Sequence, residues 1–380
     1  MEQAAFGKFI RTHSKIIVFG YADVGRMVGT KIKDACGKNV IFVDNSSQKH
    51  GVQSNGDEVL PLAEAMERFP NAGYVVASVW HGKQIREQLL SAGVPAENIE
   101  MELPQEILVQ EEERALRVHT TPRKRLYFET NITKHCNLNC KGCDHFAPVA
   151  APEYLAPEEY AKDVDRLGVL FHGDAERIVI LGGEPLLHPE IERFLEPTRR
   201  AFPQVPVWIA TNGTLVQRMK KTFWDACRTY RVGILVTHYP IALDYDALGD
   251  FVRHQGVEYQ FVGSSESGRT LWKFPLDLTG SQDPKESFDA CRNANTCLTL
   301  EHGRLYTCSI APNVPVFNRA FGQHLALTDE DGIDIYQTQS GQEILEAMAQ
   351  PMPFCRFCDV KRREYDHPWE VSGKVMEEWT

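Results

Sequence analysis

The sequence predicts an α/β protein of 380 residues in three parts: a small α/β unit, a longer run of βα repeats and a cysteine-rich α+β region. Short apolar runs alternate with helix-length amphipathic segments from Lys124 onward, which predicts a parallel sheet with right-handed crossovers. A shorter alternation of the same kind occupies the first hundred or so residues. The chain has 10 cysteines, most of them clustered at 136–143 and 291–358. We therefore expect metal ligation in a reducing compartment rather than disulfides.

The composition is that of an ordinary globular protein, with 43% hydrophobic and 24% charged residues. No run of eighteen apolar residues occurs, and Met1–Ile10 does not resemble a secretory signal. We therefore expect no membrane association and a cytoplasmic location. The net charge of −11 argues against a nucleic-acid or anionic-membrane binder, although local basic sites leave room for small anionic substrates.

Residues 1–103 are predicted to form a Rossmann-like α/β domain of three or four strands. Asp44 ends the second strand, where a Rossmann unit contacts a ribose, but the glycines read G-x-x-x-x-G-x-x-x-G and not the dinucleotide fingerprint. The expected strands are Lys15–Gly20, Asn39–Asp44 and Tyr74–Trp80, followed by a helix over His81–Ala92.

Three interpretations of this domain stay open: a nicotinamide site, a site for another nucleotide or nucleotide-sugar, and a docking or dimerisation module. Similar small units are appended to enzymes of nucleotide-sugar and polysaccharide biosynthesis. A fold alone does not fix a function. A Glu-rich segment with one apolar helical face then predicts a linker helix over residues 104–123.

Residues 124–285 contain the βα repeats. The expected strands are Arg125–Thr130, Arg177–Leu181, Val205–Ala210, Gly233–Thr237, Val257–Val262 and a weaker sixth at Thr270–Phe274. The expected helices are Pro157–Phe171, Pro189–Ala201, Leu215–Thr229 and Tyr245–His254.

The loop after the first of these strands carries Cys136, Cys140 and Cys143 in a C-x-x-x-C-x-x-C pattern. Thiolates bind soft metal centres, and a cubane iron–sulfur cluster normally takes four of them. Three ligands therefore leave one iron open, and an open position is typical of a reactive metal site. A zinc knuckle or a group of buried thiols is the alternative.

Two further strand ends strengthen the iron–sulfur interpretation. Gly182-Gly183-Glu184-Pro185 follows the second strand, and Thr211-Asn212-Gly213 follows the third. Together with the cysteine spacing, this order resembles the radical S-adenosylmethionine (radical SAM) superfamily. One departure is Gly142, because the residue before the third cysteine is usually aromatic in that family.

The resemblance implies a partial (β/α)6 TIM-like barrel over 124–285, with catalysis at the carboxyl ends of its strands. It also implies a [4Fe-4S] cluster on Cys136, Cys140 and Cys143 and S-adenosylmethionine on its open iron, with Glu184 accepting a hydrogen bond from the cofactor's amine. Other expected cofactor contacts are Gly182, Gly183, Thr211, Asn212, Thr237 and His238. His145 and Tyr239 are candidate catalytic residues beside the pocket, with packing as the alternative role.

A second cysteine set predicts a C-terminal domain over 286–380. Cys291, a G-x-x-x-x-C ending in Cys308, and a C-x-x-C pair at Cys355 and Cys358 resemble the auxiliary-cluster "twitch" domain, a smaller relative of SPASM domains. Cys297 is left over, and replacing Cys291 as a ligand, donating hydrogen from its thiol, and simple burial all stay open. Structural zinc is the alternative to a second [4Fe-4S] cluster. A β-hairpin is expected around His302-Gly303.

The resemblance implies that a 5′-deoxyadenosyl radical abstracts hydrogen from the substrate. We expect an oxidoreductase acting on a small carbohydrate-like or nucleotide-sugar substrate, with the auxiliary cluster accepting an electron as an alcohol carbon is oxidised. Flavodoxin or ferredoxin is the expected reductant. Epimerisation of the same substrate and modification of a peptide or protein are the alternatives, although an N-terminal α/β unit is not the winged-helix unit typical of peptide-modifying enzymes.

Overall fold

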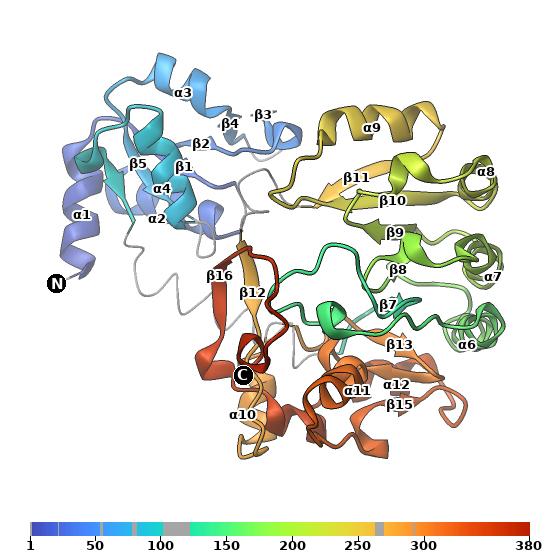
Figure 1. The fold of residues 1–380 in the computed structure, drawn as a ribbon. Helices are drawn as coiled ribbons and strands as arrows, with labels where there is room; N and C mark the ends of the chain where they lie inside the picture. The colour runs from blue at the N-terminus through green and yellow to red at the C-terminus, as the bar shows by residue number, and fades with distance from the viewer. Residues whose placement is uncertain are drawn as a thin grey trace. The chain divides into compact units, whose positions relative to one another are not determined.

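The computed structural model describes residues 2–21, 23–53, 56–77, 82–101, 122–262, 270–291 and 293–380. The chain divides into two compact units, Met1–Ala115 and Leu116–Thr380 (Figure 1). The linker helix predicted over 104–123 lies outside the described residues apart from its last two positions. None of the described helices is both long and apolar enough to cross a membrane.

The N-terminal unit contains a sheet with the strand order β3-β4-β2-β1-β5-β6. All pairs are parallel except β3 with β4. Six strands are more than the three or four that we predicted, because β3, β4 and β6 are only two or three residues long and leave almost no periodic signal. The strands are β1 Ile16–Phe19, β2 Ile41–Val43, β3 Gly51–Val52, β4 Glu58–Leu60, β5 Gly73–Val76 and β6 Ile99–Glu100.

Helices cover both faces of this sheet. Alternate residues of β1 point to opposite faces and therefore pack against different helices. Ile16 and Val18 pack in one core with α1 and α2, whereas Ile17 and Phe19 pack in a second core with α3 and α4. The helices are α1 Glu2–Thr12, α2 Asp23–Cys36, α3 Leu62–Arg68 and α4 Gly82–Ser91. The junction of the predicted strand Tyr74–Trp80 with the helix His81–Ala92 falls at residues 78–81, outside the described residues.

Asp44 has a set of protein partners at the end of β2. Its carboxylate accepts hydrogen bonds from the backbone N–H groups of Tyr21 (2.8 Å) and Ser46 (2.9 Å), and it pairs with Lys49 at 2.9 Å. These contacts tie the loop after β1 to the end of β2. The ribose contact expected of Asp44 stays a prediction.

The second unit contains a sheet with the order β11-β10-β9-β8-β7-β13-β14-β15. The first six of these strands are mutually parallel, which confirms the predicted α/β class with a partial barrel. The strands are β7 Tyr127–Asn131, β8 Arg177–Leu181, β9 Val207–Thr211, β10 Val232–Thr237, β11 Tyr259–Val262, β13 Thr299–Glu301, β14 Arg304–Tyr306 and β15 Ile333–Asp334.

The sixth parallel strand is not the one that we predicted. The predicted segment forms β12 (Thr270–Lys273), which pairs antiparallel with β16 (Glu364–Pro368) instead of joining the barrel sheet. The sixth parallel strand is β13, which pairs with β7 and not with β11, and its predicted hairpin with β14 is confirmed. β13 lies on the far side of β7, where the Glu129 N–H donates to the carbonyl of Leu298 at 2.7 Å. The C-terminal cysteine region is therefore continuous with the barrel sheet.

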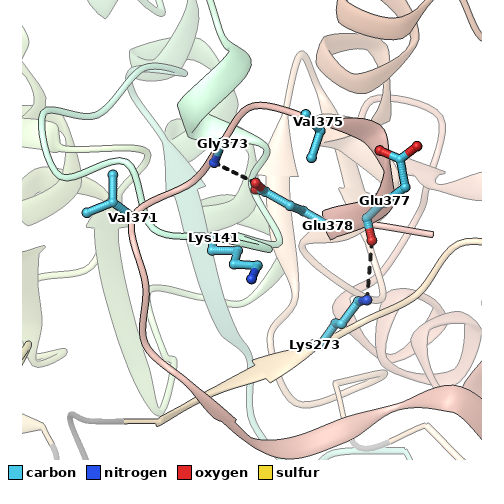
Figure 2. A pocket seen from close by; sticks show the side chains of 7 residues that line it. All are labelled: Lys141, Lys273, Val371, Gly373, Val375, Glu377 and Glu378. Atoms are coloured by element: carbon cyan, nitrogen blue, oxygen red, sulfur yellow. Dashed lines mark hydrogen bonds between the residues drawn. The ribbon is translucent and has the colours of Figure 1, made fainter.

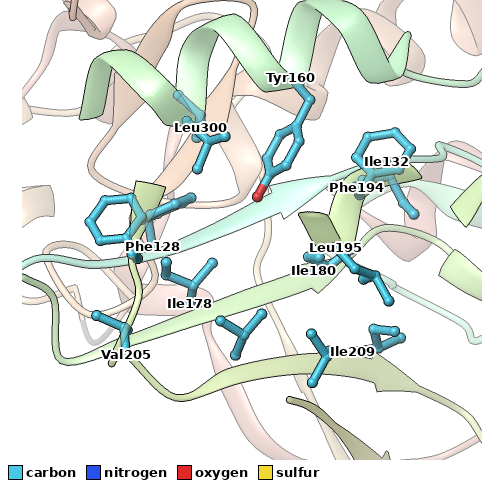
Figure 3. Packing of buried hydrophobic residues seen from close by; sticks show 14 of the residues in the cluster. Phe128, Ile132, Tyr160, Ile178, Ile180, Phe194, Leu195, Val205, Ile209 and Leu300 are labelled. Carbon is cyan, nitrogen blue, oxygen red and sulfur yellow. The ribbon is translucent and has the colours of Figure 1, made fainter. Parts of the chain in front are cut away.

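The main core lies between this sheet and its helices (Figure 3). Phe128 and Ile132 of the β7 segment pack there with Tyr160 of α6. By strand alternation, Tyr127, Glu129 and Asn131 point to the opposite face, the interior of the partial barrel. The helices are α6 Pro157–Leu170, α7 Leu195–Ala201, α8 Lys221–Thr229, α9 Tyr245–His254, α10 Pro284–Asp289, α11 Ile310–Phe321 and α12 Gly341–Met348.

Candidate metal centres

The three cysteines of the first loop lie together beyond the end of β7. Each is half-buried. Burial raises the pKa of the Cys136 thiol to about 11. Burial also raises the pKa of Cys140 far above its ordinary value, and the neighbouring Cys143 and Cys136 raise it further. Thiols that disfavour one another's ionisation in this way are stabilised as thiolates by a shared metal centre, so the donor set fits a soft metal.

Two of these sulfurs accept hydrogen bonds from N–H groups. The backbone N–H of Leu138 donates to Cys136 Sγ at 3.4 Å, and the indole Nε1–H of Trp369 donates to Cys140 Sγ at 3.2 Å. Such donors are common around metal-bound thiolates, whose charge they stabilise. No local pattern predicts this role of Trp369, because Trp369 lies 229 positions from Cys140 in the chain.

The glycine pair after β8 holds the cysteine loop through the backbone. Gly183 N–H donates to the carbonyl of Thr133 at 2.9 Å, and Glu184 N–H donates to the carbonyl of His135 at 3.0 Å. A Cβ on Gly182 would lie 2.3 Å from Thr133 O, and a Cβ on Gly183 would lie 2.2 Å from His135 O. Only glycine permits this approach, so the two predicted motifs form one structure.

The Glu184 carboxylate is fully buried and already has three protein donors. It accepts hydrogen bonds from Thr211 Oγ1 (2.6 Å), Asn212 N (2.9 Å) and Leu186 N (3.1 Å). Burial raises the pKa of Glu184 to about 7. The side chain therefore joins the ends of β8 and β9. Acceptance of the cofactor's amine by this carboxylate stays a prediction.

Asn212 connects the end of β9 to the cysteine loop. Its Nδ2 donates to Asn137 Oδ1 at 2.9 Å and lies 3.7 Å from Cys136 Sγ. Asn137 in turn donates to Thr214 Oγ1 at 2.8 Å. The predicted residues Thr211 and Asn212 are thus brought to the cysteines through Glu184 and Asn137.

The residues at and just after the end of β10 lie in different surroundings. Tyr239 lies beside the cysteines, since Cys140, Cys143 and Cys136 add to the effect of burial in raising its pKa. The His238 ring instead packs against Tyr245 and Phe261, with ring centroids 4.1 and 5.4 Å apart. Thr237 is half-buried at the end of the strand. The cofactor contacts expected of Thr237 and His238 stay predictions.

His145 belongs to a small polar group next to Cys143. Its Nδ1 lies 2.9 Å from Asp144 Oδ1, and the other carboxylate oxygen accepts from Ser309 Oγ at 2.9 Å. Ligand atoms of Cys143, Asp144 and His145 all lie within 4.8 Å of one another, which is close enough for them to share a metal ion. Both carboxylate oxygens have protein partners, which favours an ion pair here.

Three residues of β7 that sequence reasoning missed line the inner face of the sheet. The Tyr127 hydroxyl donates to the Glu129 carboxylate, and burial raises the pKa of Glu129. Asn131 is 4% exposed, and neither of its amide atoms has a hydrogen-bond partner among the residues that the structure describes. Their signal in the sequence was the alternation of β7, which puts three polar-tipped side chains on one face.

Four cysteines of the C-terminal region form a second group. Cys291, Cys308 and Cys355 are buried, and Cys358 is half-buried. Burial raises the pKa of Cys358 to about 12, with a further contribution from Cys291. Cys358 and Cys291 likewise add to the effect of burial in raising the pKa of Cys308. The Arg363 guanidinium donates to Cys291 Sγ at 3.3 Å.

Cys297 faces a different neighbourhood. After burial, the groups that raise its pKa most are Glu129 and Asp144, and Cys308 contributes less. The thiol is half-buried, and Cys297 lies two residues before β13, the strand that pairs with β7. The arrangement places Cys291 with Cys308, Cys355 and Cys358, whereas Cys297 lies toward the first site.

A hollow of about 440 Å³ lies under the C-terminal loop (Figure 2). Lys273 Nζ donates to the carbonyl of Glu377 at 3.3 Å, and Gly373 N–H donates to Glu378 Oε1 at 2.6 Å. Its lining residues are Lys141, Lys273, Val371, Gly373, Val375, Glu377 and Glu378.

The geometry agrees with what a comparison with known families finds. Residues 130–244, from the end of β7 to the loop before α9, match the Radical SAM superfamily. The chain carries a radical SAM domain. Members of this superfamily use a [4Fe-4S] cluster and S-adenosylmethionine, and the matched residues include Cys136, Cys140, Cys143 and the two strand ends that hold their loop.

The names of curated relatives of this chain describe different activities. GTP 3',8-cyclase of Helicobacter pylori (strain ATCC 700392 / 26695) is 28% identical over 102 residues, covering 26% of this chain and 31% of that protein. The antilisterial bacteriocin subtilosin biosynthesis protein AlbA of Bacillus subtilis (strain 168) is 31% identical over 111 residues, covering 29% of this chain and 23% of that protein. The chain thus spans less than a third of the length of either.

Solved structures that resemble this chain are more distant in sequence. BtrN in complex with AdoMet and 2-DOIA has a TM-score of 0.40 and 17% identity, covering 63% of this chain and 94% of that one. Native anSMEcpe with bound AdoMet has a TM-score of 0.38 and 12% identity, covering 62% and 90%.

Proposed function

We propose that this chain is a radical SAM oxidoreductase that oxidises an alcohol carbon of a small carbohydrate-like or nucleotide-sugar substrate. The proposed ligands of the first cluster are Cys136, Cys140 and Cys143, and those of an auxiliary cluster in a twitch-like domain over 286–380 are Cys291, Cys308, Cys355 and Cys358. Flavodoxin or ferredoxin is the proposed reductant. The observation that carries the proposal is that a second set of four thiols is grouped in one buried cluster, in a region whose hairpin β13–β14 continues the radical SAM sheet.

When bound, the cluster and S-adenosylmethionine supply a 5′-deoxyadenosyl radical, which removes a hydrogen atom from a substrate C–H bond. The protein's task is then to place that bond, exclude water and take up a proton and an electron. Glu184, Thr211 and Asn212 hold the strand ends in place, and Gly182 and Gly183 let the cysteine loop approach them.

The inner residues of β7 suit a hydroxylated substrate. Conversion of an alcohol carbon to a ketone removes one hydrogen atom from carbon, one proton from the hydroxyl and one electron. Glu129 lies on this inner face, and because burial raises its pKa, its carboxylate is a stronger base than an exposed one and is a suitable acceptor for the hydroxyl proton. The amide of Asn131, which has no partner among the described residues, is suited to bind a second hydroxyl group.

Cys297 favours a second candidate, epimerisation of the same substrate. Its half-buried thiol lies near Glu129 and Asp144, where it would return a hydrogen atom to a substrate radical. A peptide substrate is the third candidate, because a bacteriocin biosynthesis protein is among the relatives. The polar inner face of β7 supports the small hydroxylated substrate over the peptide.

Iron counting tests the two-cluster proposal. After anaerobic reconstitution we expect about eight irons per chain, four for each cubane. Cys358→Ala should retain about four irons, and Cys297→Ala should retain about eight. The control is Cys227→Ala, because this buried cysteine of α8 lies in the main core. Wild-type protein with only about four irons would contradict the auxiliary cluster.

Isotope transfer tests the reaction. Reconstituted enzyme with dithionite and S-adenosylmethionine should form 5′-deoxyadenosine, and a substrate deuterated at the oxidised carbon should pass deuterium to it. Candidate saccharides and nucleotide-sugars are compared in this assay. A ketone product supports oxidation, and inverted stereochemistry without net oxidation would support the epimerase instead.

A further inference from the structure

The C-terminal segment 369–380 lies directly on the first cysteine loop; we call it the strap. Lys141 N–H donates to the carbonyl of Glu370 at 2.9 Å, and Ser372 N–H donates to the carbonyl of Asn139 at 2.8 Å. Cys140 and Val371 form an antiparallel bridge between these two bonds. The strap is therefore paired with the loop through its backbone, as a strand would be.

The far end of the strap lies on the same loop. The Trp379 indole N–H donates to the carbonyl of Cys143 at 2.8 Å, and Trp379 is 2% exposed. The contact between this end of the strap and the cysteine loop explains why position 142 is glycine and not an aromatic residue. Gly142 has φ +68°, and a Cβ there would lie 3.3 Å from the carbonyl oxygen of Glu378. The strap occupies the space that an aromatic side chain at position 142 would need.

Trp369 begins the strap and is the residue that reaches a sulfur. Its Nε1 lies 3.2 Å from Cys140 Sγ, within the range for an N–H to sulfur hydrogen bond. Its ring centroid lies 6.5 Å from that of Tyr239, which faces the same three cysteines. Two aromatic rings, one from the strap and one from the end of β10, thus flank the thiols.

We propose that Trp369 is a positioning residue that tunes the reduction potential of the first cluster through its hydrogen bond to Cys140. The proposal rests on the cluster proposed above for Cys136, Cys140 and Cys143. Reduction adds negative charge to the cluster and its sulfurs, so a donated hydrogen bond stabilises the reduced form more than the oxidised form. Hydrogen bonds to the sulfurs therefore raise the potential.

The test is an anaerobic redox titration of the reconstituted full-length protein, followed by electron paramagnetic resonance. The signal that changes when S-adenosylmethionine is added reports the first cluster. Trp369→Phe keeps an aromatic ring but removes the N–H donor, so we expect the midpoint potential of this signal to move to more negative values. Iron content should stay that of the wild type, because Phe removes no ligand.

Two controls separate the hydrogen bond from other effects. Trp272→Phe makes the same change at a 39% exposed position of β12, and in this variant the midpoint potential of the first cluster should not move. Glu370→Gln removes the strap's ion pair with Lys141, and because it removes a negative charge it should not move the midpoint to more negative values. Thermal unfolding of the cluster-free variants checks that each one folds.

An unchanged midpoint in Trp369→Phe, or an equal shift in Trp272→Phe, would overturn the proposal. That outcome leaves the ligand set intact, since the signal itself is present. Wild-type protein that gives no signal responsive to S-adenosylmethionine would instead reject the proposed ligands, and the role of Trp369 with them. Turnover of a substrate is not needed for either result, so the tuning role is judged independently of the proposed reaction.

Discussion

At the scale of single residues, the site depends on close backbone contacts that only glycine permits, because a Cβ atom at these positions would clash with the neighbouring backbone. Gly183→Ala would place a methyl group 2.2 Å from the carbonyl oxygen of His135, which must move away. Because His135 directly precedes Cys136, we expect the variant to lose about four of its irons on reconstitution. Gly322→Ala is the control, since its Cβ meets open space, and its left-handed backbone costs only about 1 kcal/mol. Full iron content in Gly183→Ala would contradict this role.

Glu184 gives a pH dependence with a defined sign. Its pKa is raised from 4.5 to about 7 by burial, so the folded state binds a proton that the unfolded state has lost. Folding stability of the cluster-free wild type should therefore fall as the pH rises between these two values. Glu184→Gln cannot ionise and lacks this contribution. Urea unfolding of both proteins across that range measures the difference, and parallel curves would refute the assignment.

At the scale of elements, the residue pattern predicted the strands and helices whose signals are local. β8 (Arg177–Leu181) and α9 (Tyr245–His254) have the predicted bounds, because β8 is an apolar run and Asp244 caps α9 by accepting from Ala247 N at 2.9 Å. The partner of β12 could not be predicted, because strand pairing with β16 depends on residues about a hundred positions away.

The candidate site follows the same division. The loop with Cys136, Cys140 and Cys143 was recognisable because its ligands are close in sequence. Trp369 and Asn131 were not. Trp369 contacts the loop from the C-terminal end, and Asn131 is identified only by its buried amide, which has no hydrogen-bond partner in the described part of the chain. Contacts and burial of this kind arise only when the chain folds, so no local sequence pattern predicts them.

The attachment of β13 to β7 gives a prediction for an element. Thr130 is fully buried, and its hydroxyl donates to the carbonyl of Leu300 at 3.1 Å. Thr130→Val removes this donor, so the carbonyl of Leu300 loses its hydrogen bond from the hydroxyl. The free energy of unfolding should therefore fall by about 1–3 kcal/mol. Urea unfolding of the cluster-free protein measures this loss. Thr222→Val is a control, because Thr222 is exposed and its hydroxyl makes an exposed hydrogen bond to Glu192, so the substitution should change stability by no more than about 0.5 kcal/mol.

At the scale of the whole molecule, the two units have separate cores. Phe42 packs in a cluster of residues of the N-terminal unit, and Phe128 packs in a cluster of residues of the second unit. Domains with their own cores unfold as separate cooperative units. We therefore expect two transitions in the calorimetric unfolding of the cluster-free protein.

Core truncations assign each transition to its unit. Phe42→Ala and Phe128→Ala each remove a buried aromatic side chain, which costs about 3–5 kcal/mol. Phe42→Ala should lower the midpoint of one transition and leave the other in place, and Phe128→Ala should do the reverse. Because the proposed cluster ligands all lie in the second unit, added iron and sulfide should stabilise only the transition that Phe128→Ala lowers. A single transition that both substitutions lower would show instead that the N-terminal unit and the radical SAM unit unfold together.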